Sequence, residues 1–293
     1  MASVVAVLTP ELYGQGGWVI GDLDHEDPSS RRMCNQCDAV VVSVDYRLAP
    51  ETRFPGAAED CYVRTSALCR SCGSAGADSA GGAQAATVWA AEHAQDLRID
   101  PARIAVTGTS AGGNLAAVVA MMARDRGGPA IQHQVLFCPV IDHDFERQSY
   151  KEHGDSFACT EDSMRLFWSS YLGPDGDGHE PYASPIRAAS LAVSLERADL
   201  CLCLQSLSRG VSLRQGLPDA TVITARNDPL RDEGRDYASA LREAGVDAVY
   251  SEYADQAHAF NELQGILDAA QVAVDEACVR VVASFAKAAG PRL

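Results

Sequence analysis

A serine inside a glycine-rich turn is the residue best suited to chemistry. Residues 108–113 read Gly-Thr-Ser-Ala-Gly-Gly, so Ser110 stands between an apolar run and a stretch with helical periodicity. Small neighbours let the backbone turn sharply from strand to helix and leave the serine hydroxyl exposed. The helix start then directs N–H groups toward negative charge that develops on a substrate. The pattern predicts a nucleophilic serine, and the alternative is a turn without a catalytic role.

A serine hydroxyl needs a histidine base, and that base needs a carboxylate to orient it. Asp228 follows an apolar strand pattern at 220–224, and His258 follows another at 248–253. The chain order nucleophile, acid, base occurs in a large class of serine hydrolases. We therefore predict Ser110 as the nucleophile, Asp228 as the orienting acid and His258 as the general base.

Other residues compete for these roles. Asp232 and Asp255 are alternative acids, although either also fits a helix cap or a loop charge. Ser79 lies in a similar Asp-Ser-Ala-Gly-Gly run, but no apolar strand precedes it, so we interpret it as a loop residue. Six further histidines show no matching order: His25, His93, His133, His143, His153 and His179.

A second glycine-rich stretch lies near the start of the chain. Residues 14–18 read Gly-Gln-Gly-Gly-Trp and follow a strand pattern at 4–8. Glycines let a backbone present its N–H groups close to a substrate oxygen. The stretch is a candidate oxyanion-binding loop, and the alternative is an ordinary turn.

The elements that must position these residues alternate between short β-branched runs and longer amphipathic stretches. This alternation is typical of βαβ units and a parallel sheet. The expected strands are residues 4–8, 39–45, 104–107, 134–137, 220–224 and 248–253. The clearest expected helices are residues 86–95, 113–124, 161–172, 235–244 and 266–288. We expect one α/β domain over residues 1–293, with a mostly parallel sheet of about six strands flanked by helices.

Three segments interrupt the alternation. Residues 142–185 form a long irregular excursion with a helix of their own, which we interpret as a reduced lid above the sheet. Residues 64–86 and 192–216 lack a clear period and are interpreted as atypical surface insertions.

Charge and hydropathy exclude several classes of partner. The chain has 24 basic and 40 acidic residues, a formal net charge of −16. Such a surface repels nucleic acid and anionic lipid, so we expect neither as a partner. No apolar run approaches the ~20 residues that span a bilayer. The N-terminal residues do not resemble an export signal, so we expect a cytoplasmic location.

The cysteines raise the question of a metal site. Cys34 and Cys37, with Cys69 and Cys72, have the spacing of a four-thiolate zinc site. A predicted strand and turn lie between the two pairs, so we favour free or buried thiols and expect no metal and no cofactor.

Five stretches together resemble the hormone-sensitive-lipase-like carboxylesterases of the α/β-hydrolase superfamily. They are residues 16–22, 45–51, 108–114, 228–234 and 258–260, within a resemblance that runs from about 13 to 287. The resemblance implies the α/β-hydrolase fold and a serine esterase acting on small short-chain acyl esters through an acyl-enzyme. It assigns the triad to Ser110, Asp228 and His258. Backbone N–H groups of Gly16, Gly17 and Ala111 would form the oxyanion hole.

The chain also departs from this family. Gly14 and Gln15 stand where the family has the histidine and first glycine of His-Gly-Gly-Gly-Trp, which implies a less firmly held oxyanion loop. The N-terminal part is shorter than in the family, so strand 39–45 is expected at an exposed sheet edge through which two copies could pair. Two alternatives remain: an inactive or ligand-binding protein of this fold, and an amidase or lactonase with the same triad.

Overall fold

The structure is a computed structural model that describes residues 2–8, 16–23, 27–62, 86–188 and 216–288. The insertions expected at 64–86 and 192–216 lie outside these residues except for positions 86 and 216. Four of the residues named above also lie outside them: Ser79, His25, Gly14 and Gln15.

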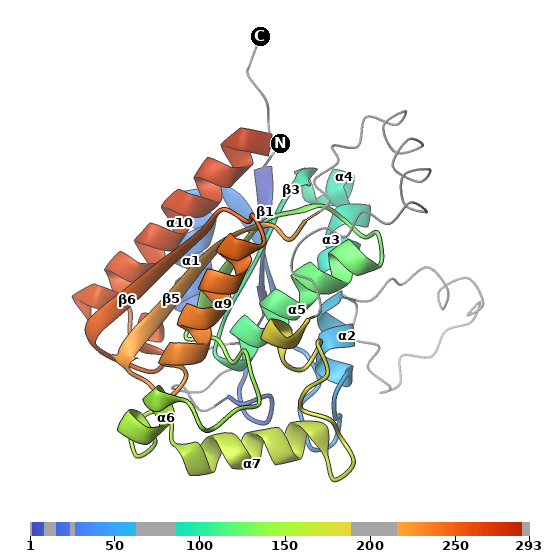
Figure 1. The fold of residues 1–293 in the computed structure, drawn as a ribbon. Coiled ribbons are helices and arrows are strands. Elements are labelled where there is room, and N and C mark those ends of the chain that lie inside the picture. Colours follow the sequence, from blue (N-terminus) through green and yellow to red (C-terminus); the bar gives the residue numbers. More distant parts are fainter. Residues whose placement is uncertain (1, 9–15, 24–26, 63–85, 189–215, 289–293) are drawn as a thin grey trace.

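A six-stranded, wholly parallel sheet forms the centre of the described fold (Figure 1). Its spatial order is β2-β1-β3-β4-β5-β6, so the chain crosses over between neighbouring strands. The strands are β1 (Ala2–Leu8), β2 (Ala39–Val44), β3 (Ile99–Thr109), β4 (Ile131–Phe137), β5 (Asp219–Asn227) and β6 (Ala248–Ala257). The predicted fold class, an α/β-hydrolase sheet of about six strands, is confirmed.

Helices cover both faces of the sheet (Figure 1). One face packs against α1 (Asp27–Cys37) and α10 (Asp268–Ala288). The other face packs against helices that include α5 (Ala111–Asp125) and α9 (Arg231–Glu243). The remaining described helices are α2 (Gly56–Tyr62), α3 (Ala86–Glu92), α4 (Ala94–Leu97), α6 (Gln148–His153) and α7 (Glu161–Leu172), with short 3₁₀ turns η1 (Pro185–Arg187) and η2 (Phe260–Glu262).

Coverage on both faces explains the apolar runs in the sequence. Every residue of β4 is buried, as a central parallel strand between two helical layers requires. Helix α5 is also buried over most of its length, which accounts for its run of Ala, Val and Met residues. The two layers hold the carboxyl ends of β3, β5 and β6 in a fixed relation at one edge of the sheet.

Several expected elements differ in extent, and the helix expected over 86–95 and strand β3 are two of them. The helix expected over 86–95 is instead two short helices, α3 and α4, which meet at His93. The His93 N–H and a His93 ring nitrogen both lie 2.9 Å from the Trp89 carbonyl oxygen, so the regular helical hydrogen bond is retained where the two helices meet. Strand β3 begins at Ile99 rather than at residue 104, because Ile99 still pairs with Ala2 of β1.

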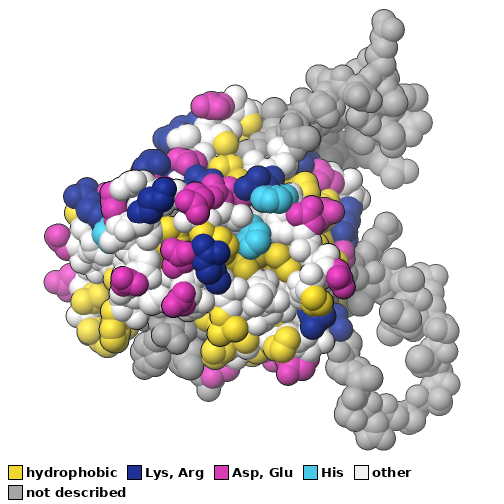
Figure 2. All heavy atoms as spheres, turned by 60° about the horizontal axis from the view of Figure 1, so that its bottom comes forward, with side chains coloured by type: hydrophobic (Ala, Val, Ile, Leu, Met, Phe, Trp, Pro, Cys, Tyr) yellow, Lys and Arg dark blue, Asp and Glu magenta, His cyan; other side chains and the backbone are white. Residues whose placement is uncertain are grey.

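The excursion at 142–185 contains α6, α7 and η1, and α6 and α7 lie across one end of the sheet (Figure 1). Acidic and basic side chains are interspersed on this face of the molecule (Figure 2). Arg147 and Arg187 both pair with the buried carboxylate of Asp142, at 2.7 and 2.5 Å. Arg231 of α9 pairs with Glu152 of α6 at 2.9 Å, so ion pairs tie the excursion to the rest of the fold.

Strand β2 lies at one edge of the described sheet. Its central valines, from Val40 to Val42, are half-buried. Pairing of two copies through this edge stays a prediction. Among the described residues, no helix has both the length and the apolar character needed to cross a bilayer.

Candidate active site

Ser110 occupies the turn between β3 and α5. Its backbone has φ 52° and ψ −114°, a conformation that costs a non-glycine residue about 1–3 kcal/mol. The Ser110 N–H donates to the Phe137 carbonyl of β4 at 2.8 Å, which secures the turn against the neighbouring strand. Gly113 lies so close to β4 that an added Cβ would be 2.9 Å from the Pro139 Cβ. The small residues around Ser110 therefore allow the close contact that the turn requires.

Three predicted residues meet at this turn. His258 Nε2 lies 3.0 Å from the Ser110 hydroxyl oxygen, and His258 Nδ1 lies 2.8 Å from Asp228 Oδ2. An ionised carboxylate favours the tautomer with hydrogen on Nδ1, so that Nε2 accepts the hydrogen bond from Ser110. All three side chains are buried. The arrangement can remove a proton from the serine hydroxyl as the oxygen attacks an electrophile.

Asp228 and His258 reach this position because each follows a strand of the same sheet. Asp228 comes directly after β5, and its Oδ1 accepts a hydrogen bond from the Leu230 N–H at 2.9 Å. His258 comes directly after β6, and the next residue, Ala259, has a left-handed φ of 56°. The side-chain amide of Asn261 in η2 donates to Thr109 Oγ1 at 2.8 Å. This bond links the segment that follows β6, which carries His258, to Thr109, the residue before Ser110.

The negative charge on Asp228 changes the pKa of His258. Burial by itself disfavours the imidazolium, but the Asp228 carboxylate more than offsets this effect and raises the pKa of His258 above its ordinary value. Glu262 adds a smaller contribution in the same direction. The carboxylate therefore stabilises the imidazolium that proton transfer from Ser110 would produce.

The alternative acids lie elsewhere. Asp232 stands in the first turn of α9, where it accepts from the Ser149 N–H at 2.9 Å and pairs with Arg231 at 3.0 Å. Asp255 is an exposed residue of β6. Neither has the helix-cap or loop role that its sequence context suggested, because Asp232 lies inside α9, whose N-cap is Leu230, and Asp255 lies inside β6.

The other described histidines also have other surroundings. His133 is buried in β4, with its ring nitrogens 2.9 Å from Ser284 Oγ and 2.8 Å from Thr221 Oγ1. The His143 ring lies 4.8 Å from the Trp168 ring. His93 closes the short connection between α3 and α4, and His153 lies in α6 beside Arg231. Only His258, among the described histidines, adjoins Ser110.

The glycine-rich loop forms a tight turn held by aromatic side chains of α7. The Gly16 carbonyl accepts from the N–H groups of Val19 and Ile20, at 2.8 and 2.9 Å. Gly17 has φ 48°, and a Cβ added there would lie 2.1 Å from Phe167 Cγ. Trp18 is fully buried, and its ring stacks on Tyr171 with centroids 4.1 Å apart. Helix α7 is therefore the support of this loop.

Ala111, the third predicted oxyanion residue, is the first residue of α5. Its N–H group belongs to the first turn of the helix, where the helix dipole favours negative charge. The described structure thus places Ala111 next to the nucleophile, whereas Gly16 and Gly17 belong to the loop under α7.

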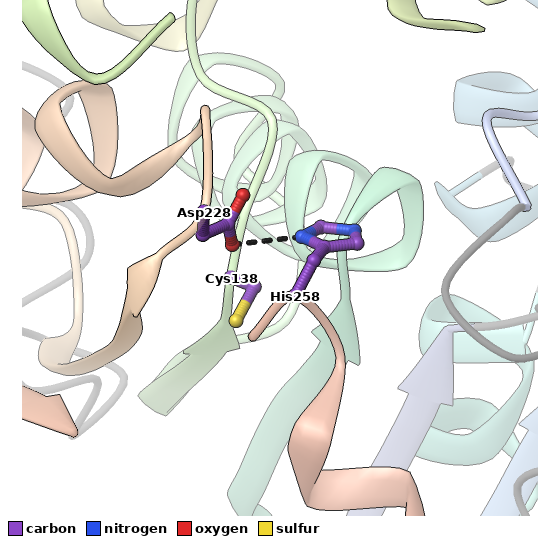
Figure 3. Close-up of side chains that lie close together, drawn as sticks. All are labelled: Cys138, Asp228 and His258. Carbon is purple, nitrogen blue, oxygen red and sulfur yellow. Dashed lines mark hydrogen bonds and ion pairs between the residues drawn. The ribbon is translucent and has the colours of Figure 1, made fainter. Parts of the chain in front are cut away.

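Sequence reasoning missed two contributions to the site. Phe167 and Tyr171 gave a signal only as apolar residues of a predicted helix, with nothing to connect them to residues 16–18. Cys138 gave no signal at all. It follows β4 directly, and its Sγ lies within 4.8 Å of a carboxylate oxygen of Asp228 and a ring nitrogen of His258 (Figure 3).

The four-cysteine spacing, for which we favoured free or buried thiols, cannot be followed in full, since Cys69 and Cys72 lie outside the described residues. Cys34 is exposed and Cys37 is buried at the end of α1. The Cys37 thiol lies 3.9 Å from the Cys278 carbonyl oxygen of α10, in helix packing.

Comparison with known proteins agrees with this architecture. The sequence pattern of the alpha/beta hydrolase fold family matches residues 13–262. Carboxylesterase NlhH of Mycobacterium tuberculosis is 34% identical over 258 residues, which are 88% of this chain and 68% of that protein. Carboxylic ester hydrolase LipN of the same species is 38% identical over 80% of this chain, and the matched part spans about half of LipN (52%).

Solved structures show the same likeness. The crystal structure of EstE1, a thermophilic carboxylesterase cloned from a metagenomic library, superposes with a TM-score of 0.77 and 33% identity. The match covers 97% of this chain and 80% of EstE1. The chain is a hydrolase that belongs to the α/β-hydrolase fold family, in the hormone-sensitive-lipase-like carboxylesterase branch that its sequence motifs predicted.

Proposed function

We propose that this protein is a serine carboxylic ester hydrolase that acts on small, short-chain acyl esters through an acyl-enzyme. One observation carries the proposal: the hydrogen-bonded chain from Ser110 Oγ through His258 to Asp228, at 3.0 and 2.8 Å. This geometry is that of a nucleophile with its base and an oriented acid. The similarity to carboxylesterases over most of the chain supports an ester as the substrate.

In the first half of the reaction, Ser110 Oγ attacks the ester carbonyl carbon while its proton passes to His258 Nε2. Asp228 stabilises the resulting imidazolium through Nδ1–H. The carbonyl oxygen becomes an oxyanion that the N–H groups of Gly16, Gly17 and Ala111 would bind. Collapse of this intermediate breaks the bond to the alcohol oxygen, which takes the proton from His258 and leaves the acyl group on Ser110.

In the second half, a water molecule repeats the attack on the acyl-enzyme, with His258 again as base, and releases the acid and free Ser110. The Ser110 side chain lies in a site where the serine is only 2% exposed.

The test is hydrolysis of p-nitrophenyl acetate and butyrate by the purified protein, with and without a serine-directed organophosphate. The proposal expects hydrolysis of both esters, loss of activity on labelling, and labelling at Ser110. Ser110→Ala should abolish turnover and leave the fold intact. Ser169→Ala, which removes an exposed hydroxyl of α7, is the matched control and should remain active.

Two results would contradict this proposal. A folded protein that neither hydrolyses the esters nor reacts with the organophosphate would indicate an inactive or ligand-binding member of the family. Hydrolysis of amides or lactones in preference to open-chain esters would leave the triad assignment intact and replace the proposed substrate class.

A further inference from the structure

The backbone of Ser110 is held by the end of β4 and the residues that follow it, a segment that spans residues 137–141. The Ser110 N–H donates to the Phe137 carbonyl at 2.8 Å, and the Ser110 carbonyl accepts from the Val140 N–H at 3.1 Å. A serine with a φ of 52° keeps this conformation only where the surrounding structure maintains it. The position of the nucleophile therefore depends on the position of segment 137–141.

A buried carboxyl group from a distant part of the chain binds this segment. Glu233, in the first turn of α9, accepts a hydrogen bond from the Ile141 N–H through Oε1 at 2.8 Å. Both residues are fully buried. The next residue of the helix, Gly234, is so near the segment that an added Cβ would lie 3.6 Å from Pro139 Cδ. The first turn of α9 thus packs directly against the residues that hold Ser110.

The same helix follows the acid of the triad. Asp228 lies three residues before α9 begins at Arg231. The side-chain hydrogen bonds from Ser110 through His258 to Asp228 are one link between the nucleophile turn and this part of the chain. The bond from Ile141 to Glu233 is a second link, made through the backbone of the segment that holds Ser110. The two links together close a ring around the site.

A carboxyl group is a costly side chain for this position. Burial removes its hydration, a cost that an apolar side chain of similar size would not have. Burial also raises the pKa of Glu233 well above its ordinary value, against the opposing effects of the Ile141 N–H and the Arg147 guanidinium. The neutral carboxyl that burial favours still has a carbonyl oxygen to accept from Ile141. An apolar residue would leave that buried N–H without this acceptor, so the carboxyl has a specific use here.

We propose that Glu233 is a positioning residue, whose carboxyl oxygen holds Ile141 and thereby keeps the Val140 N–H on the Ser110 carbonyl. This inference rests on the proposed function, in which Ser110 is the nucleophile. Among the described residues, Glu233 is hydrogen-bonded to the backbone of this segment and to no side chain of the triad. Its loss should therefore slow attack by Ser110 and leave substrate binding unchanged.

The test compares Glu233→Leu, which removes the acceptor, with Glu233→Gln, which keeps an uncharged carbonyl oxygen at the same distance from the backbone. Two rates report on Ser110: kcat for p-nitrophenyl acetate, and the second-order rate constant for labelling by a serine-directed organophosphate. Both should fall about tenfold in Glu233→Leu, as for loss of one buried hydrogen bond, with KM unchanged. Glu233→Gln should retain both rates, because it still accepts from Ile141.

Asp232→Leu is the matched control. Asp232 is the neighbouring residue of α9 and also accepts from a backbone N–H, that of Ser149 in α6, at 2.9 Å. The variant should lower thermal stability and leave both rates unchanged, since Ser149 lies outside the segment that holds Ser110. Equal falls in Asp232→Leu and Glu233→Leu would overturn the proposal, because they would indicate a general loosening of α9.

A double variant tests whether Glu233 acts through the segment. The side-chain amide of Asn114 in α5 donates to the Val140 carbonyl at 3.0 Å, so it holds the same segment from its other side. Effects that pass through one shared structure are not additive in free energy. The losses of labelling rate in Asn114→Leu and Glu233→Leu should therefore not multiply in the double variant. Losses that multiply would overturn the proposal.

Two further results would overturn it. One is wild-type kcat and labelling in a folded Glu233→Leu, and the other is an equal loss in Glu233→Leu and Glu233→Gln. If Glu233→Leu does not fold, Glu233→Asp replaces it, because its carboxylate is one methylene shorter and no longer reaches the Ile141 N–H. Wild-type rates in Glu233→Asp would then overturn the proposal.

Failure of the proposed function gives a different result. A wild-type protein that is labelled at Ser110 but hydrolyses no ester would refute the proposed substrate class. The labelling rates of Glu233→Leu and Glu233→Gln would still decide whether Glu233 positions the nucleophile.

Discussion

The imidazole of His258 is enclosed by groups that act on its charge in opposite directions. Burial disfavours the imidazolium, whereas Asp228 and Glu262 favour it, and the balance raises the pKa of His258. A general base works only in its neutral form. A raised pKa therefore means that the base is protonated, and inactive, over a wider range of acidic pH than a free histidine would be.

We expect kcat/KM for p-nitrophenyl acetate to fall on acidification with an apparent pKa above ~6.5, the value of an unperturbed histidine. Glu262→Gln removes one of the raising charges and should move this limb to lower pH. The measurement is kcat/KM as a function of pH for both proteins. A wild-type limb at or below that value would contradict the assignment of His258 as the base.

Asp228→Asn should lower kcat by about 10⁴-fold with little change in structure. The asparagine side chain can donate to Nδ1, which favours the tautomer with hydrogen on Nε2 and removes the acceptor for Ser110. Steady-state kinetics at the optimum pH, with circular dichroism to check folding, measure this effect. Asp232→Asn is the control, because Asp232 is bonded to Ser149 and arginines rather than to His258. Equal losses in both variants would indicate general destabilisation.

Gly17→Ala should reduce kcat/KM by about 10²–10³-fold, the cost of displacing one oxyanion donor. An alanine there would need a positive φ, and its Cβ would overlap Phe167, 2.1 Å away. Gly127→Ala is a matched control: Gly127 also has positive φ, at 62°, but nothing lies within 4 Å of its added Cβ. Kinetics of both variants separate the local clash from the backbone strain. Full activity in Gly17→Ala would contradict a role for this glycine in the oxyanion loop.

At the scale of elements, α7 supports the glycine-rich loop that is predicted to bind the oxyanion. Trp18 is buried between that helix and the rest of the fold, in contact with Tyr171 and Trp168. The Tyr171 carbonyl also accepts from the Phe54 N–H at 2.8 Å. We expect this part of the predicted lid to be a fixed support, because movement of α7 would expose Trp18 and the aromatic side chains that cover it.

Tyr171→Ala should lower the free energy of unfolding by about 3–5 kcal/mol, the range for loss of a large buried aromatic side chain. It should also lower kcat, because the stacking that holds Trp18 is lost. Tyr171→Phe should retain both stability and activity, since the buried hydroxyl finds no hydrogen-bond partner among the described residues. Urea unfolding and ester kinetics measure the two effects. Leu166→Ala, at an exposed position of the same helix, should change neither, and a large effect there would contradict this account of α7.

At the scale of the whole molecule, the two helical layers leave polar groups inside the fold. His133 of β4 is buried between Thr221 of β5 and Ser284 of α10. Burial lowers its pKa to about 4. The unfolded chain therefore binds a proton at His133 between pH 6.5 and 4, whereas the folded protein does not, so stability falls as the pH decreases through this interval.

The contribution of His133 to this loss is at most about 3.5 kcal/mol, from its pKa difference at ~1.4 kcal/mol per pKa unit. His133→Gln removes the titrating group and retains hydrogen-bonding atoms for the two hydroxyls. Its free energy of unfolding should therefore decrease less than that of wild type between pH 7 and 4.5, as measured by urea denaturation. An identical pH dependence in both proteins would show that His133 is protonated in the folded state.

Much of this architecture is determined by local patterns along the chain. Ser110, Asp228 and His258 each follow an apolar strand segment, and parallel strands bring their carboxyl ends to one edge of a sheet. The strand positions were predictable for the same reason, because strands covered on both faces require continuous apolar runs. These features depend on residues that are close in sequence, so a single sequence suffices to predict them without an alignment.

The tertiary structure alone decided the contacts between distant segments. Phe167 meets Gly17 across 150 residues, and Cys138 meets Asp228 across 90, through packing that no periodicity encodes. The sequence by itself determined which residues reach the edge of the sheet, because strand and turn patterns are local. Which side chains support them there was decided by the tertiary structure, because close packing joins surfaces whose complementarity exists only after folding.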